Sequence, residues 1–153
     1  MNKTSKYPTI ESSLSTEFKK DQELSKIRIY MMKFVYGMTF LLLGYRMWSY
    51  LLNPEELIPS MDGVAYSFWA AYATMMGFGL RYPAKFLPLI ILQLFYKSVW
   101  ILTVALPLRM AGELDSGSAD MLQSFTIAVV IDLFVIPWAY AYRNYVKYLF
   151  VWK

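Results

Sequence analysis

The sequence predicts an all-α protein, a four-helix transmembrane bundle with both termini in the cytoplasm. Hydrophobic residues make up 58% of the 153-residue chain and charged residues only 17%, which is too apolar for an ordinary soluble surface. Four apolar segments follow one another, each close to the ~20 residues that a helix needs to cross hydrocarbon. None of them alternates apolar and polar residues, so a transmembrane β-barrel is excluded.

Residues 1–25 are polar throughout and precede the first apolar segment. They lack the short apolar stretch and small-residue cleavage site of a signal peptide, so we predict a cytoplasmic tail. An amphipathic helix lying on the membrane surface is the alternative for the second half of this tail.

The transmembrane domain is predicted over residues 26–148, followed by a short C-terminal tail of residues 149–153. Its spans are expected at about residues 30–52, 62–80, 86–108 and 121–142. The sequence NPEE at 53–56 ends the first span, and the turn RYPAK at 81–85 makes the second and third spans antiparallel neighbours. A loop rich in Gly, Ser and acidic residues precedes the fourth span.

Basic residues are distributed very unequally between the two predicted sides. Of the 15 Lys and Arg residues, Lys97 falls inside a span and only Arg46 and Arg109 fall on the side opposite the termini. The remaining twelve share a side with the termini and the 81–85 turn. This positive-inside distribution predicts a multi-pass protein of the cell inner membrane.

Lys97 and Asp132 are charged residues within the third and fourth predicted spans. Lys97 is twelve residues from both Lys85 and Arg109, and Asp132 is twelve residues after Asp120. In antiparallel spans both would lie at one depth, about 16–18 Å from each end at a rise of 1.5 Å per residue. A lone charge at the bilayer midplane costs roughly 2.5–3.5 kcal/mol on insertion scales, so we predict that the two residues pair.

Gln93 and Trp100 lie close to the helix face of Lys97, four residues before it and three after it. We therefore predict a polar centre of Lys97, Asp132, Gln93 and Trp100 that binds a ligand or relays protons. The structural alternative is an ion pair that only fixes the helix register. In either case, Asp132→Asn and Lys97→Met should each be more damaging than the two changes together.

Two further patterns concern the packing of the spans. Ala70, Ala73, Thr74, Gly77 and Gly79 give the second span small residues at four-residue spacing, which favours close helix packing inside the bundle. Pro137 lies five residues after Asp132, and a kink is expected there because proline has no amide hydrogen.

The chain has neither cysteine nor histidine. Disulfides, Fe–S clusters, Cys/His zinc sites and haem on a His or Cys ligand are thereby excluded, and we expect no cofactor and no metal. The usual neutral-pH acid–base side chain is also absent, which argues against an enzyme. Basic residues cluster beside apolar spans rather than on a soluble face, so no nucleic-acid partner is expected.

Two stretches of the chain carry a family resemblance. The first has GLRYP at 79–83, LPL at 87–89, Gln93, YK at 96–97, Trp100 and LP at 106–107, and the second has IPWxY at 136–140 and YVK at 145–147. Over residues 66–148 they resemble a group of small bacterial four-helix membrane proteins with no assigned function. The helix layout and the Gly-Leu-Arg turn are also similar to DoxX-like proteins, some of which are tied to quinone-linked oxidoreductase systems. Neither resemblance implies catalytic residues for this chain.

The expected function is a binding or accessory role in the membrane, with a buried Lys–Asp polar centre. Its partners would be the lipid bilayer and a small lipophilic ligand or another membrane protein, and a homo-oligomer is compatible with this role. Two alternatives stay open. One is a membrane oxidoreductase subunit acting with quinone or another lipophilic substrate, and the other is a small proton-coupled transporter.

Overall fold

The computed structural model describes residues 24–147, and every regular element in this part of the chain is helical. Predictions for the N-terminal tail up to residue 23 and for residues 148–153 lie outside the described residues. The first long segment joins α2 (Lys26–Met38), the π-helical turn η1 (Thr39–Leu43) and α3 (Gly44–Leu52), and the second is α4 (Ser60–Gly79). The third joins α5 (Leu87–Trp100), the π-helical turn η2 (Ile101–Ala105) and α6 (Leu106–Ala111). They are followed by α7 (Ser116–Val135), α8 (Trp138–Ala141) and η3 (Tyr142–Val146).

Three of these helical segments are long and apolar enough to cross a membrane: Lys26–Leu52, Leu87–Ala111 and Ser116–Val135. Helix α4 has 20 residues but mixes Gly, Ala and aromatic residues with few aliphatic ones, and it falls outside this group. Many large apolar side chains on the outside are uncovered, for example Leu102 at 64% and Phe134 at 70% exposure. Such a surface is suited to lipid rather than water.

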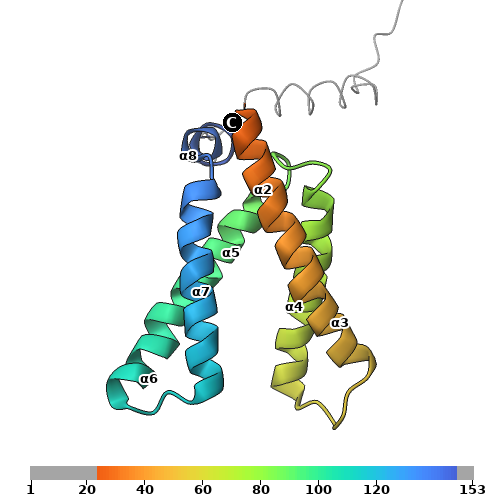
Figure 1. Ribbon diagram of the computed structural model, residues 1–153, viewed down its shortest axis with the longest axis vertical. Coiled ribbons are helices and arrows are strands. Elements are labelled where there is room, and N and C mark those ends of the chain that lie inside the picture. The colour runs from red at the N-terminus through yellow and green to blue at the C-terminus, as the bar shows by residue number, and fades with distance from the viewer. Residues whose placement is uncertain (1–23, 148–153) are drawn as a thin grey trace, which may run out of the picture.

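The long segments form two antiparallel pairs, one of α2–η1–α3 with α4 and the other of α5–η2–α6 with α7 (Figure 1). The pairs meet at the end that holds the start of α2, the α4–α5 turn and α8, and they diverge toward the other end (Figure 1). The fully buried core lies mainly at the closed end, where Tyr36, Met76, Leu87, Ile90 and Ile136 are almost inaccessible.

Glycines on α4 allow the first pair to pack closely. A Cβ at Gly79 would lie 2.4 Å from the Tyr36 ring, and a Cβ at Gly77 would lie 2.9 Å from the Phe40 ring. The Tyr36 hydroxyl donates a hydrogen bond to the carbonyl of Pro83, in the turn after α4, at 2.9 Å. Ala70, Ala73 and Gly79 are buried inside the molecule, as their spacing predicted, whereas Thr74 is exposed.

Asp115 begins α7. Its carboxylate accepts hydrogen bonds from the Ser118 hydroxyl at 2.7 Å and from the Ser118 amide at 2.9 Å. These bonds favour the charged form and hold the pKa of Asp115 below its ordinary value. The helix thus starts at Ser116, five residues before the expected Met121, because the N-cap determines where it begins.

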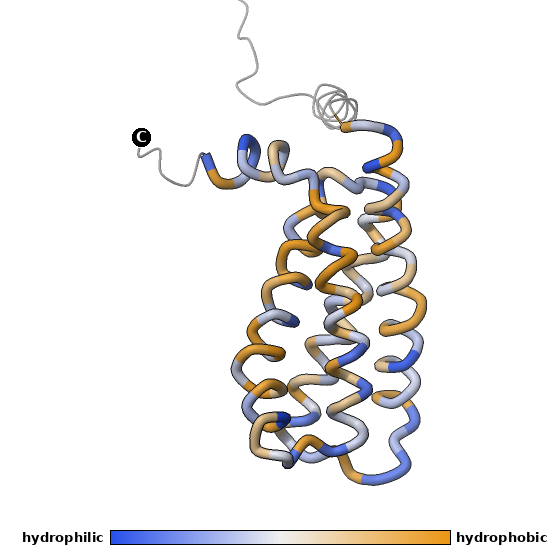
Figure 2. The backbone as a smooth tube through the Cα atoms, turned by 60° about the vertical axis from the view of Figure 1, so that its left-hand side comes forward, coloured by the Kyte–Doolittle hydropathy of each residue, from blue (hydrophilic) through white to orange (hydrophobic). Residues whose placement is uncertain are grey.

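Pro137 breaks the fourth segment instead of only kinking it. Helix α7 ends at Val135, and Ile136 is extended, as expected for a residue before proline. Two backbone carbonyls at the end of α7 accept hydrogen bonds from side chains instead of from helix amides. The indole Nε1 of Trp138 donates to the Leu133 carbonyl at 3.0 Å, and Arg28 Nη1 donates to the Phe134 carbonyl. Residues 138–146 then turn away from the long helices at the closed end (Figure 2).

The break corrects the expected fourth span of residues 121–142. Asp132 lies three residues before the end of α7, so it is near the closed end and not at the centre of a span. Lys97 stays in the middle of its segment, ten residues after Leu87 and fourteen before Ala111. The two charges are therefore offset in depth, because the equal-depth prediction assumed a helix that continued through Pro137 to residue 142.

Candidate functional site

A cavity of about 560 Å³ lies between the first segment, α5 and α7. Its apolar lining comes from two sides: Phe34, Met38 and Leu42 from the first segment, and Ile127 and Ile131 from α7. The polar lining includes Gln93 and Lys97 of α5 and Asp132 of α7. The sequence-predicted polar residues thus share one cavity with an apolar surround.

Gln93 is the hydrogen-bond partner of Asp132. Its Nε2 atom lies 2.9 Å from one carboxylate oxygen of Asp132 and 3.1 Å from the other. Both side chains are almost completely buried, Asp132 at 0% and Gln93 at 3% exposure. A buried carboxylate without a donor is costly, so this amide stabilises Asp132 in its position.

The other end of the Gln93 amide faces two hydroxyl groups. Thr39 of η1 donates to Oε1 at 3.1 Å, and the Tyr72 hydroxyl of α4 lies 3.0 Å from the same oxygen. A carboxylate can only accept hydrogen bonds, so the amide nitrogen must face Asp132 and the oxygen must face the hydroxyls. One side chain of α5 therefore connects η1, α4 and α7.

Lys97 is outside this network. It is 8% exposed and forms no hydrogen bond or ion pair with any of residues 24–147, so the predicted direct pair with Asp132 is not formed. Its Nζ lies 5.4 Å from the centre of the Phe125 ring and 6.0 Å from that of Tyr96. Every fully buried side-chain nitrogen or oxygen of the described residues has a hydrogen-bond partner. Because Lys97 Nζ has none, it is not fully buried, and Lys97 lines the cavity.

The offset between Lys97 and Asp132 has a geometric reason. Gln93 and Asp132 are level because they are bonded, and Lys97 lies four residues further along α5, which is roughly 6 Å at 1.5 Å per residue. Helix α7 runs antiparallel to α5, so the residues level with Lys97 come before Asp132 in the sequence. Phe125, which precedes Asp132 by seven residues, accordingly lies beside the ammonium group.

Trp100 reaches the site through Phe125. The two rings are 5.2 Å apart and meet edge to face, and Phe125 also meets Tyr96 at 5.9 Å. This aromatic cluster supports the side of the cavity on which Lys97 lies. Trp100 does not line the cavity, so its predicted place in the polar centre is corrected to a contact with Phe125, which does line it.

Three site residues, Thr39, Tyr72 and Phe125, did not stand out in the sequence. Thr39 and Tyr72 are single hydroxyl residues within apolar helices, and such residues usually bond to their own backbone or lie at the interface. Only the tertiary contact with the Gln93 amide distinguishes them. Phe125 is one of ten phenylalanines and carries no sequence signal.

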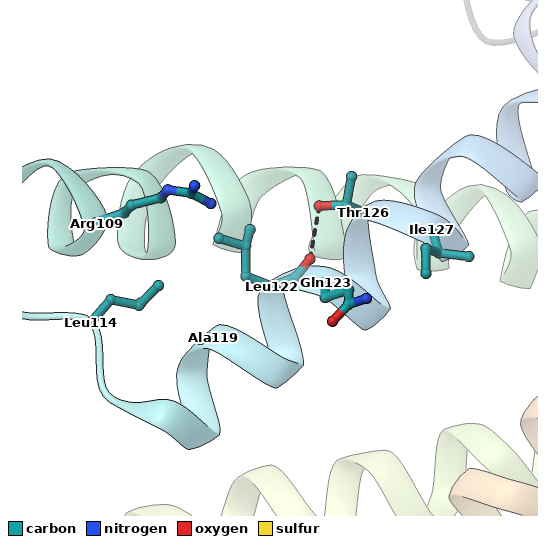
Figure 3. A pocket seen from close by; sticks show the side chains of 7 residues that line it. All are labelled: Arg109, Leu114, Ala119, Leu122, Gln123, Thr126 and Ile127. Atoms are coloured by element: carbon teal, nitrogen blue, oxygen red, sulfur yellow. Dashed lines mark hydrogen bonds between the residues drawn. The ribbon is translucent and has the colours of Figure 1, made fainter.

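A second cavity, of about 460 Å³, lies between α6 and the first half of α7. Figure 3 shows Arg109 of α6 and Leu114 of the loop facing Leu122, with the Thr126 hydroxyl bonded to the Leu122 carbonyl. Arg109 is exposed, and this cavity has no buried polar cluster comparable to that of Gln93 and Asp132. The first cavity is therefore the candidate site.

The described residues contain no group of three His, Cys, Asp or Glu side chains that could bind a metal ion. Comparison with known protein families, curated proteins and solved structures finds no match to this chain. The chemistry of the cavity alone therefore carries the functional argument.

Proposed function

We propose that this chain is a multi-pass inner-membrane protein in which α4 completes a four-helix transmembrane bundle with both termini in the cytoplasm. Three helices have the length and composition to cross a membrane, and α4 is as long as α7 and packs against the first of them. Charges support the orientation. Lys26, Arg28, Arg81, Lys85 and Arg143 gather at the closed end, whereas the loops at the other end hold Glu55, Glu56, Glu113 and Asp115.

Within this topology we propose that the protein binds a small lipophilic ligand in the cavity between the first segment, α5 and α7. One observation carries the proposal: a mostly apolar cavity of about 560 Å³ contains, beside a Gln93–Asp132 pair, a buried lysine that forms no hydrogen bond or ion pair with any of residues 24–147. Ligand pockets commonly measure ~300–1,000 Å³ and combine apolar walls with a few polar groups. A role as a binding or accessory membrane protein fits this cavity.

The ligand is proposed to enter sideways from the bilayer. Phe34, Leu42 and Ile127 line the cavity and are also 60%, 62% and 54% exposed on the outer surface. Because these side chains belong to helices that would face lipid, the cavity mouth would open to hydrocarbon rather than water. A molecule dissolved in the bilayer could then reach the polar groups without crossing an aqueous phase.

Native mass spectrometry of the protein purified in mild detergent tests this proposal. Ala128 lines the cavity, so Ala128→Phe should fill it and remove any co-purifying lipophilic molecule. Val130→Phe is the matched control, because Val130 lies on the same helix and is 48% exposed. We expect the ligand in the wild type and in Val130→Phe but not in Ala128→Phe, with all three eluting as folded protein.

Equal ligand occupancy in all three proteins would contradict the proposal, as would absence of any bound molecule in the wild type. The chemistry of the molecule separates the alternatives. A bound quinone would support the oxidoreductase subunit, because a quinone is a lipophilic substrate that suits the same apolar cavity. Proton-coupled uptake into vesicles that disappears in Asp132→Asn would support the transporter.

A further inference from the structure

We infer that the cavity selects a single-chain lipophilic anion, with Lys97 as the partner of its headgroup. The inference rests on the proposed ligand binding and names the class of ligand. Its starting point is Lys97, which is buried yet has neither hydrogen bond nor ion pair with any of residues 24–147. A buried ammonium group is unfavourable unless it is hydrogen-bonded and paired, and an anionic ligand would supply the direct contact that Asp132 does not make.

Asp132 does not serve as that partner. Both of its oxygens lie within hydrogen-bond distance of Gln93 Nε2, and Gln93 is held in turn by Thr39 and Tyr72. This network is complete without Lys97. The ammonium group instead lies beside the Phe125 and Tyr96 rings and reaches the cavity.

Arg46 provides a second positive charge in the lining of the same cavity. Thr39 and Gln93 are level because they are hydrogen-bonded, and the first segment runs parallel to α5. Beyond this contact, Lys97 follows Gln93 by four residues on α5, and Arg46 follows Thr39 by seven residues on the first segment. Both cations line the same cavity, so Arg46 adds to the positive charge that a bound anion meets there.

The charges and the size of the cavity define the ligand class. Two cations and one carboxylate line the cavity, and this leaves one positive charge for a monoanion to neutralise. The apolar mouth suits a hydrocarbon chain, and a volume of about 560 Å³ suits one chain rather than two. Such a headgroup could belong to a free long-chain carboxylate or to an anionic phospholipid that inserts one acyl chain.

The test uses the full-length protein in phosphatidylcholine nanodiscs and a fluorescent polyene fatty acid, with its neutral methyl ester as the comparison. Measurements are made at neutral pH, where a carboxylic acid is ionised. We expect the wild type to bind the acid about tenfold or more tightly than the ester, as a charge-assisted hydrogen bond implies. In Lys97→Met this preference should disappear while ester binding remains, and Lys97→Arg should largely retain the preference.

Two further variants test the contribution of Arg46 and the effect of removing a lysine outside the cavity. Arg46→Met should reduce the preference for the acid in part, because Lys97 remains. Lys85→Met is the matched control for Lys97→Met, since Lys85 is an exposed lysine at the α4–α5 turn and does not line the cavity. It should bind both probes as the wild type does.

Equal binding of acid and ester by the wild type would overturn the inference and leave the proposed ligand binding intact. A preference that persists in Lys97→Met would also overturn it. If neither probe binds, the proposed binding function fails together with the inference. Displacement of the acid by added phosphatidylglycerol would identify a phospholipid as the source of the headgroup, and resistance to displacement would identify a free carboxylate.

Discussion

Gln93 belongs to the polar centre that the sequence predicted, and its hydrogen-bond partner there is Asp132. Four-residue spacing from Lys97 made it a neighbour of the lysine on one helix face, but its amide points across to Asp132. It is the only side chain of α5 that hydrogen-bonds to side chains of three other segments, within the part of the chain that the structure describes. The stability of the buried carboxylate therefore depends on Gln93 rather than on Lys97.

Replacement of Gln93 by leucine should destabilise the protein because Asp132 would be left buried without a donor. The expected loss is at least ~1–3 kcal/mol, the usual cost of an unsatisfied buried polar group and more for a charged one. Gln93→Leu combined with Asp132→Leu should recover part of the loss. Unfolding free energies from titration with SDS in mixed micelles would measure all three variants.

Gln123→Leu is the control for this series, because Gln123 is exposed on α7. The double-mutant cycle should give a coupling of about 0.5–3 kcal/mol between Gln93 and Asp132. The sequence predicted such coupling between Lys97 and Asp132, and we expect a smaller value for that pair because the two groups do not bond. Purely additive losses at Gln93 and Asp132 would show that their contact contributes nothing.

At the scale of elements, the contact between α4 and α2 depends on the absence of a side chain at Gly79. The ring of Tyr36 occupies the space that a Cβ would need, 2.4–2.6 Å from its ideal position. A rigid aromatic ring in a close-packed region cannot move by that amount without disturbing its neighbours.

Gly79→Ala should therefore lower stability by roughly 1–3 kcal/mol, the range seen for overpacked cores. It should also displace the Tyr36 hydroxyl from the Pro83 carbonyl. Gly63→Ala lies on the same helix, where the nearest atom is Ile58 Cγ2 at 3.6 Å, an ordinary contact. Thermal unfolding in detergent should show a lower midpoint for Gly79→Ala and little change for Gly63→Ala. Similar midpoints for the two variants would refute the close approach.

At the scale of the whole molecule, the two ends of the helix bundle carry opposite charge. The start of α2, the α4–α5 turn and α8 share the closed end, and the basic residues of the described chain are concentrated there (Figure 1). The loops after α3 and α6 lie at the opposite end, and all of their charged residues are acidic. This distribution of charge supports the proposed orientation, with the closed end in the cytoplasm.

Single-cysteine labelling can test the topology cleanly because the chain has no cysteine of its own. Glu55→Cys and Lys85→Cys place exposed thiols at opposite ends of the molecule. A membrane-impermeant maleimide added to spheroplasts should label Glu55→Cys, and it should label Lys85→Cys only after permeabilisation. Labelling of Lys85→Cys alone in intact spheroplasts would reverse the proposed orientation. Labelling of both variants would show that residues 55 and 85 lie on the same side, so that α4 does not cross the membrane.

The sequence by itself determined the all-helical fold, the apolar character of the outer surface and the identity of Gln93, Lys97 and Asp132 as buried polar residues. Hydrophobic length and charge placement act locally along the chain, so they can be read without coordinates. Only the tertiary structure decided which of these residues touch. The depth of Asp132 depends on where Pro137 ends α7, and the Gln93–Asp132 contact depends on the register between two helices. Because that register is set by packing across the whole molecule, Lys97 faces an open cavity instead of the carboxylate that spacing alone had assigned to it.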